Sequence, residues 1–584
     1  MKSLITSKSG IKSRILGVGT ILISAALLTG CISDNLSDCP SEVDPNVSSG
    51  TGSSSDFYLT VNVVYPGSES SRATTVAGGG SSDGENQGVN NEQLVNSLNL
   101  YFFDATDNSS NKGNLLCEFT TATPSDGHDP LFKTKADAAT GTMTFAQKVD
   151  VNDVKKIFGK KVSIYALANL QEYPTSVTTE NILCEKAINV TASDFGTSTS
   201  YSRAFVQESD GNYGMVCPMA NYEYFTLDLT NHPLPDNSDE AALAAMMELF
   251  TGSFAYRDDN GEFVSGRNYQ ITNSDAESKN SGSLELERMI ARIDYMSGHS
   301  ETFQREGVGT VTENNIYKLA GHISSISSAN TTDGGVYLKL NNLTLFNLYD
   351  QAYMIRHTAL DGAAVKPFGF EGSTGSSYNW IASKTGGNFF NEYNVTGISS
   401  THGSALADDI IKTDDIIKTK VPDYDNNGYS PWFYIMENTV LSKDDMDLNH
   451  CTGISLELVL CDATTGLPIV GKEEDAVRIT NSTSKEYQVL SFKETDAQSE
   501  TGYFYLTYKY LIEHNRATNG TTNPETGKMT NLSPMQIGVV RNNIYRLSLT
   551  GISKLPSPQA ADNYNLQVNV SLKPWGYSTE ENEW

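Results

Sequence analysis

Short runs of alternating hydrophobic and polar residues recur along the chain, starting near its N-terminus. The first run covers residues 57–65, where every second side chain is apolar or aromatic: Phe57, Leu59, Val61, Val63 and Tyr65. Successive side chains of a strand point to opposite faces, so these residues share one face of a predicted strand that ends at Pro66. Comparable runs lie at 94–104, 141–151, 160–170, 222–230, 283–296, 336–349, 455–463, 503–513, 542–552 and 564–575. This spacing predicts an all-β fold of sandwiches or barrels.

The last run alternates as cleanly as the first. One face of the predicted strand carries only aliphatic side chains: Leu566, Val568, Val570 and Leu572. The opposite face carries Gln567, Asn569 and Ser571. Helical patterns are few, with the best at 239–250 and a weaker one at 405–420.

The N-terminus has the pattern of a bacterial lipoprotein signal peptide. Basic residues come first, an apolar stretch follows from Ile15 to Leu28, and the sequence Leu-Thr-Gly ends at Cys31. We therefore predict that residues 1–30 are removed, that Cys31 carries the lipid, and that Ile15–Leu28 is not a membrane span. Residues 31–56 are then a lipidated, flexible polar leader.

A second polar segment follows the first predicted strand. It covers roughly residues 68–91 and is rich in Gly, Ser and Asn. Arg72 is the only basic residue between Cys31 and Lys112, and it lies in this exposed-looking segment. Residues 57–72 thus combine a strand with a loop that a protease could cut.

Composition excludes some functions. The 584 residues include 70 acidic and 41 basic residues, for a net charge of −29. Binding to nucleic acid needs a clustered basic face, so we expect no nucleic-acid partner. The length predicts roughly two to four domains.

Cysteine, histidine and carboxylate spacing predicts neither an enzyme nor a cofactor site. The cysteines beyond the leader are Cys117, Cys184, Cys217, Cys451 and Cys461. They include no CxxC pair, and we expect buried free thiols. No two of the eight histidines have metal-ligand spacing, and the GxSxG match at 80–84 lacks the flanking strand and helix of a nucleophile.

One loop has partial calcium-site spacing. Asp423, Asp425 and Asn427 are arranged as oxygen ligands often are, and a glycine follows them. The twelfth position of that pattern is Tyr434 instead of Glu. A polar turn is favoured over a metal site, and Ca²⁺ stays a weak candidate.

Removal of the first strand would leave a sandwich with an open edge. Such an edge accepts another strand of suitable alternation. The strand at 564–575 is a candidate donor because its Leu566–Leu572 face is continuous and apolar.

Three segments carry a family resemblance. They are LELERMIARIDYM at 284–296, PMQIGVVRNNIYRLSLTGI at 534–552 and the C-terminal NLQVNVSLKPWGYSTEENEW. Together with the lipobox and Arg72, they resemble the fimbrillins, the subunits of type V pili in Bacteroidota. The length is similar to that of the minor-fimbria shaft subunit. The resemblance implies two tandem Greek-key, transthyretin-like β-sandwich domains with a few short helices and no catalytic residue.

The resemblance also implies a mechanism and partners. A lipidated precursor reaches the outer membrane, an arginine-specific or trypsin-like protease cuts between Arg72 and Ala73, and the first strand leaves with the lipid. The donor strand of a neighbouring copy then fills the vacancy, which gives an extracellular fimbrium that supports adhesion. Partners are other copies of the chain and the anchor and tip subunits.

The expected domain limits follow the same scheme. They are a signal peptide at 1–30, a leader at 31–56, a removable strand and loop at 57–72, an N-terminal sandwich at 73–296, a C-terminal sandwich at 297–555 and the donor segment at 556–584.

Two alternatives stay open. The leader CISDNLSDCP at 31–40 resembles the start of pilus anchor lipoproteins, so an anchor or tip subunit is possible within the family. Outside the family, a surface lipoprotein could bind glycans by stacking Trp380 and Trp432 on sugars.

Overall fold

The computed structural model describes part of the chain. The described residues are 56–64, 86–87, 90–122, 130–137, 142–189, 214–221, 225–257, 263–274, 282–296, 299–320, 323–327, 335–349, 351–355, 389–390, 393–394, 430–438, 448, 451–475, 477–481, 483, 485–489, 491–494, 501–514, 521–522, 529–530, 538–557, 561–563 and 565–576. All of them belong to one compact unit, residues 54–584.

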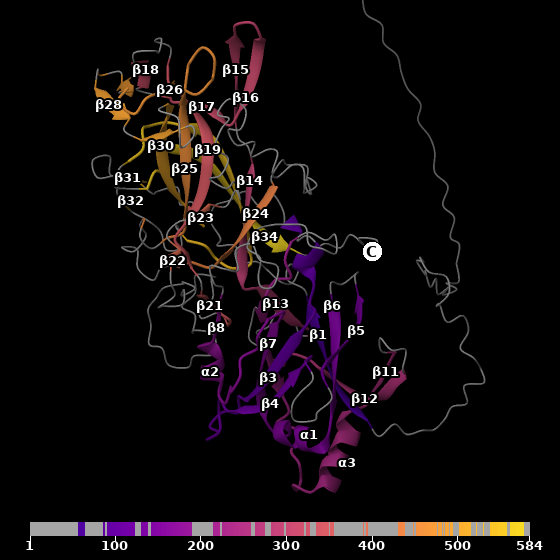
Figure 1. Ribbon diagram of the computed structural model, residues 1–584. Coiled ribbons are helices and arrows are strands. Elements are labelled where there is room, and N and C mark those ends of the chain that lie inside the picture. Colours follow the sequence, from indigo (N-terminus) through magenta and orange to yellow (C-terminus); the bar gives the residue numbers. More distant parts are fainter. Residues whose placement is uncertain are drawn as a thin grey trace, which may run out of the picture. The chain divides into compact units, whose positions relative to one another are not determined.

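The N-terminal half forms an eleven-stranded sheet that folds over on itself (Figure 1). Its main path runs β11-β12-β1-β13-β9-β7-β3-β4, and β10, β5 and β6 branch from that path. The strands are β1 (Phe57–Val64), β3 (Leu98–Asp104), β4 (Leu115–Thr120), β5 (Phe132–Asp137), β6 (Thr142–Val149), β7 (Lys161–Ala168), β9 (Met219–Asn221), β10 (Phe225–Asp228), β11 (Gly252–Arg257), β12 (Phe263–Ile271) and β13 (Leu284–Arg288).

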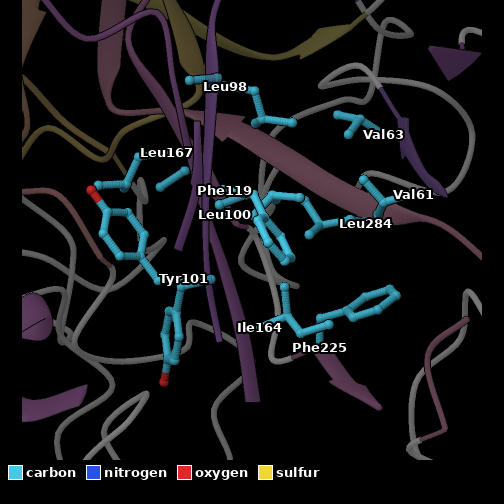
Figure 2. Packing of buried hydrophobic residues seen from close by; sticks show 14 of the residues in the cluster. Val61, Val63, Leu98, Leu100, Tyr101, Phe119, Ile164, Leu167, Phe225 and Leu284 are labelled. Carbon is cyan, nitrogen blue, oxygen red and sulfur yellow. The ribbon is translucent and has the colours of Figure 1, made fainter. Parts of the chain in front are cut away.

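One hydrophobic core joins the part of this sheet around β1 to the part around β7. Side chains of β1 and β6 pack with those of β3, β4 and β7 in a single buried cluster. Figure 2 shows Val61 and Val63 of β1 beside Leu284 of β13, with Leu100 and Phe119 gathered near them. Alternating apolar positions on the strands therefore face inward from both sides, as in a β-sandwich.

The C-terminal half has two larger sheets and its own core. One sheet has the order β2-β34-β33-β14-β24, and the other has the path β17-β19-β25-β30-β26 with β23 and β29 attached. The strands are β2 (Asn86–Gln87), β14 (Ile290–Met296), β17 (Ile316–Lys318), β19 (Tyr337–Phe346), β23 (Tyr393–Asn394), β24 (Ser430–Met436), β25 (Gly453–Cys461), β26 (Val470–Gly471), β29 (Phe492–Glu494), β30 (Gly502–Leu511), β33 (Asn543–Ile552) and β34 (Leu566–Gly576). A second buried cluster takes side chains from both sheets.

Small sheets complete the described strands. They are β15 (Ser300–Arg305) with β16 (Gly309–Asn314), β18 (Ile323–Ser327) with β27 (Val477–Asn481) and β28 (Glu486–Val489), β20 (Leu348–Tyr349) with β22 (Phe389–Phe390), β21 (Gln351–Tyr353) with β8 (Ala187–Asn189), and β31 (Thr521–Thr522) with β32 (Met529–Thr530).

The chain passes from the first core to the second in the middle of one predicted strand. The run 283–296 is not continuous, because β13 ends at Arg288 and β14 begins at Ile290. β13 pairs with β1 and β9, whereas β14 pairs with β24 and β33. Met289 and Ile290 pack in the first core, and Ala291 packs in the second.

Three short α-helices occur in the described part of the chain: α1 (Val151–Ile157), α2 (Glu180–Cys184) and α3 (Asp239–Leu249), with a 3-10 turn, η1 (Asn90–Gln93). Side-chain caps fix where they begin. Asp150 accepts hydrogen bonds from two backbone amides of α1, and Ser238 accepts one from Ala241 of α3. The predicted helix at 239–250 is confirmed, and the one at 405–420 lies outside the described residues.

The predictions of an all-β fold and of free thiols are both confirmed. The cysteines that the structure describes are free and buried. No helix among the described residues has the length and apolar character needed to cross a membrane.

Candidate functional site

The first strand is paired along both of its edges. On one side, all eight residues of β1 lie antiparallel to β6, from Phe57 opposite Val149 to Val64 opposite Thr142. On the other side β1 runs parallel to β12 and then, at Val63 and Val64, parallel to β13. If β1 were absent, both neighbouring edges would expose backbone hydrogen-bonding groups.

The side chains of β1 are built into the main core. Phe57 is 4% exposed, Leu59 is 3%, and Val61 and Val63 are each 1%. Burying four such side chains stabilises the fold by about 1.5–3 kcal/mol each, or roughly 6–12 kcal/mol in gross terms. This strand therefore contributes heavily to the N-terminal core.

The opposite face of β1 is also covered. The Tyr58 ring packs against Phe254 of β11 with 4.6 Å between centroids. Gly266 of β12 lies directly under this ring, because a Cβ atom there would be 2.7 Å from Tyr58. We call the space that β1 occupies the slot. Its walls are fitted to the side chains on both faces of β1.

The last strand lies in the sheet of its own C-terminal half. β34 pairs antiparallel with β33, from Asn543 opposite Pro574 to Ile552 opposite Leu566. Leu566 is 4% and Val568 is 8% exposed, and both belong to the second core, whereas Gln567 is exposed. The backbone register places Val570 opposite Leu547 and Leu572 opposite Tyr545. β1 and β34 are in separate sheets and do not pair within the chain.

The base of β34 is tied to β30 by two consecutive residues. The Asp562 carboxylate accepts hydrogen bonds from the Lys509 amide at 2.9 Å, the Ser557 amide at 2.7 Å and the Asn565 side chain at 2.8 Å. Asn563 both donates to and accepts from the Leu511 backbone, each at 2.9 Å. Burial raises the pKa of Asp562 to about 6, although these donors oppose the rise.

A buried charged network lies where the chain passes between the two cores. We call Glu92, Arg288, Arg292, Asp294 and Tyr434 the junction network. Arg292 donates through Nη1 to both Glu92 oxygens, at 3.0 and 2.8 Å, and through Nε and Nη2 to Asp294, at 2.7 and 2.9 Å. The Tyr434 hydroxyl donates to Glu92, and Arg288 Nε donates to the Glu92 carbonyl at 3.1 Å.

Each charge in this network is hidden from solvent. Glu92 and Arg288 are 0% exposed, and Arg292 is 2% exposed. Burial lowers the pKa of Arg292, but the Asp294 and Glu92 carboxylates outweigh burial and raise that pKa above its usual value. Burial, with Glu92 nearby, raises the pKa of Tyr434. Loss of one partner from such a buried pair costs about 3–5 kcal/mol, because the other charge is left uncompensated.

A third buried arginine extends this arrangement. Arg541 binds Glu437, the residue that follows β24, through Nε at 2.7 Å and Nη2 at 2.9 Å, and it donates to the carbonyls of Tyr353 and Met354. Asn542 next to it has a positive φ of 58°, which turns the chain into β33. Its side-chain oxygen accepts from the Arg288 amide at 3.4 Å.

The sequence motifs at 284–296 and 534–552 thus meet in three dimensions. Their charged and amide residues supply part of the junction network and its extension, a role that the sequence did not reveal. A signal was present: Arg292 and Asp294, two residues apart, interrupt an otherwise apolar strand with opposite charges. The second carboxylate partner of Arg292, Glu92, is 200 positions from it in sequence.

Several predicted site residues lie outside the described residues: Cys31, Tyr65, Arg72, Ala73, Trp380, Asp423, Asp425 and Asn427. The lipidation, cleavage and calcium predictions therefore stay predictions. Within the described part of the chain, no group of His, Cys, Asp and Glu side chains is arranged to hold a metal ion. Trp432 lies in β24.

Buried His514 predicts a measurable dependence of stability on pH. Its Nδ1 lies 2.8 Å from the Tyr545 hydroxyl, and burial lowers its pKa from 6.5 to about 4. The folded state resists protonation that the unfolded chain accepts, so stability is complete above pH 6.5 and falls as pH drops toward 4. At about 1.4 kcal/mol per pH unit, the loss from this residue reaches roughly 3 kcal/mol.

The test compares His514→Gln with the parent chain by urea unfolding at pH 7 and pH 4.5. We expect the variant to lose less stability on acidification than the parent. Asp562 acts in the opposite direction over the same range, since its raised pKa favours the folded state as pH falls from 6 toward 3.8. Asp562→Asn should therefore lose more stability on acidification, and equal pH profiles for all three chains would contradict both assignments.

Comparisons with known proteins give structural matches only. No family model matches the chain, and no curated protein matches it in sequence. Among solved structures, a candidate cell adhesion protein from Parabacteroides distasonis matches with 13% identity and a TM-score of 0.38, covering 90% of this chain and 99% of that one. The tip fimbrial protein Mfa3 from Porphyromonas gingivalis matches with 11% identity and a TM-score of 0.31, over 89% and 100%. A fimbrilin from the same organism matches with 11% identity and a TM-score of 0.30, over 90% and 99%.

Proposed function

We propose that this chain is a structural subunit of a cell-surface pilus of the fimbrillin family, which polymerises by strand exchange. The observation that carries the proposal is the position of β1. It is the first described element, it is paired along both edges and buried on both faces, and Arg72 follows it closely in sequence. A strand with those properties can be cut away and replaced.

The vacated slot specifies what replaces it. It offers the edge of β6 on one side and the edges of β12 and β13 on the other, above a core that requires apolar side chains at every second position. The C-terminal strand supplies that alternation, with Leu566 and Val568 buried and Gln567 exposed between them. Backbone pairing would supply affinity, and the alternating side chains would supply register.

Proteolysis serves as the trigger in this scheme. While β1 is covalently attached, its effective concentration at the slot is far above that of any neighbour's strand. Cleavage between Arg72 and Ala73 removes that advantage, so a donor strand from another copy can compete. The enzyme is an arginine-specific or trypsin-like protease.

The remaining assignments complete the proposal. Cys31 holds the precursor at the outer membrane through its lipid, and the cleaved subunit joins an extracellular fimbrium that supports adhesion. The two sandwich domains are expected at 73–296 and 297–555, but β14, inside the first of these ranges, pairs with β24 and β33 and so goes with the second domain; 556–584 is the donor segment. We assign the shaft role, with anchor or tip as the alternatives, and assign no catalytic activity.

Substitution of Arg72 tests the proposal. Arg72→Ala should give a folded, lipidated precursor that stays at the membrane and builds no fibres, because β1 remains in its slot. N-terminal sequencing of sheared wild-type fibres should begin at Ala73. Arg72→Lys is the matched variant: fibres form if the protease is trypsin-like and fail if it requires arginine.

Three results would change the conclusion. Fibres of normal length from Arg72→Ala would exclude cleavage at this site as the trigger. A mature chain that starts at Cys31 would indicate an anchor subunit. Sugar binding by the cleaved protein, without SDS-resistant ladders, would indicate a glycan-binding lipoprotein.

A further inference from the structure

A short segment after the cleavage loop touches the free end of the last strand. β2, Asn86–Gln87, runs parallel to the end of β34, with Asn86 opposite Trp575 and Gln87 opposite Gly576. These residues are separated by nearly the whole length of the chain. In the described part of the sheet, β2 is the only strand on that edge of β34.

A few residues after β2, the chain is hydrogen-bonded into the junction network. Glu92 in η1 receives two hydrogen bonds from Arg292 and one from Tyr434, and its carbonyl accepts from Arg288. Asn91 next to it donates to the Gly214 carbonyl at 3.1 Å. Glu92 is 0% exposed, so its carboxylate is held entirely by protein groups.

β34 is thus held at its two ends by different means. Asp562 and Asn563 tie its base to β30, and β2 covers its tip. The pairing of β2 covers only two residues and is weak by itself, since an isolated pair of short strands is marginal in water. The hydrogen bonds of Glu92 hold η1 in place, and only two residues separate η1 from β2. Because ordering so short a connection costs little entropy, β2 stays close to the end of β34.

We propose that β2 (Asn86–Gln87) and η1 (Asn90–Gln93) form a clasp that keeps the end of the C-terminal strand in its own sheet, and that Glu92 holds this clasp in place. On the proposed function, on which this role in assembly rests, the strand must leave β33 before a neighbour can receive it. Release then begins at Trp575 and Gly576, where the clasp lies, while Asp562 and Asn563 keep the base in place. The clasp lowers the rate at which a subunit exposes its donor strand, before and after cleavage, because β2 and η1 follow Ala73 in sequence.

Hydrogen exchange on the full, uncleaved chain tests the clasp. Glu92→Gln preserves the shape of the side chain and removes its charge from Arg292. We expect amide exchange in the peptide covering 570–576 to become at least tenfold faster, with exchange at the base of β34, near Leu566, little changed. Wild-type exchange at 570–576 in this variant would overturn the proposal.

A matched control separates the clasp from general loosening of the junction. Glu437→Gln makes the same change in an equally buried carboxylate that binds Arg541 and lies outside β2 and η1. It should leave exchange at 570–576 within about twofold of the parent. An equal rise in both variants would show that the junction, and not the clasp, holds the strand.

A second variant acts without touching any buried charge. Asn86→Pro with Gln87→Pro removes both backbone N–H groups of β2, so pairing with β34 is lost while Glu92 stays in place. This double variant should also speed exchange at 570–576 tenfold, and no change would overturn the proposal even if Glu92→Gln failed to fold. These measurements need no assembly, so they stand apart from the Arg72 experiment and its outcome.

Discussion

Deleting residues 57–64 should leave the N-terminal half unable to fold alone, and a separate peptide of the same sequence should restore it. The deletion takes away roughly 6–12 kcal/mol of gross hydrophobic burial from Phe57, Leu59, Val61 and Val63. It also leaves the facing edges of β6 and β12 without a partner. Loss of that size is comparable to the whole free energy of unfolding of a typical domain.

Complementation would be followed in a chain that starts at Ala73. Without peptide, we expect aggregation or polymerisation and protease sensitivity of the N-terminal half. A soluble peptide covering Asp56–Tyr65 should give a protease-resistant, monomeric complex at a stoichiometry of one to one. Failure of the peptide to protect the chain would mean that the slot does not persist once β1 has left.

Two substituted peptides show which face of the strand matters. Leu59→Asp with Val61→Asp should abolish protection, because each carboxylate would enter the main core. Asn62→Asp should protect nearly as well as the parent peptide, since Asn62 is half-buried and its side chain lies beside the Thr144 hydroxyl. Equal protection by both peptides would contradict the structural role given to β1.

The sequence predicted individual strands well because their signal is local. Alternation over 542–552 and 564–575 corresponds closely to β33 and β34, which pair with each other. The run 283–296 shows the limit of that signal. Each half alternates acceptably, but the change of sheet at Met289 depends on which strands lie beside it, and those strands are far away in sequence.

The pairing partners of the strands and the buried ion pairs could not be predicted from the sequence for the same reason. Nothing local to residues 57–64 indicates that β12 and β13 run parallel on one side while β6 runs antiparallel on the other. Likewise Glu92 lies in a polar stretch typical of an exposed turn, yet it is fully buried against Arg292. Only the fold supplies the arginine that makes its burial tolerable.

The structure also changes the effect that we expect from substitutions that disrupt the C-terminal strand. Val568 is buried in the core of its own half, so Val568→Asp with Val570→Asp would weaken the subunit as well as any joint with a neighbour. Loss of fibres from this variant alone would therefore be ambiguous. A mixing experiment resolves the ambiguity, because donating a strand and receiving one are separate properties of a subunit.

In mixtures with wild-type chains, the Val568→Asp, Val570→Asp subunit should act as a chain terminator. On the proposed mechanism, cleavage at Arg72 vacates its slot, which should still receive a wild-type donor strand, whereas its own strand should not enter the next slot. Fibre length measured by electron microscopy should fall steadily as its share of the mixture rises, with the variant found in the short fibres.

Gln567→Asp with Asn569→Asp is the matched control on the other face of the strand. Gln567 is exposed, and a period of two places Asn569 on the same face, so these charges should leave fibre length close to that of the wild type. If the valine variant is absent from fibres and leaves their length unchanged, it has simply failed to fold. If both double variants build long fibres alone, β34 remains in its own sheet during assembly and another segment must be the donor.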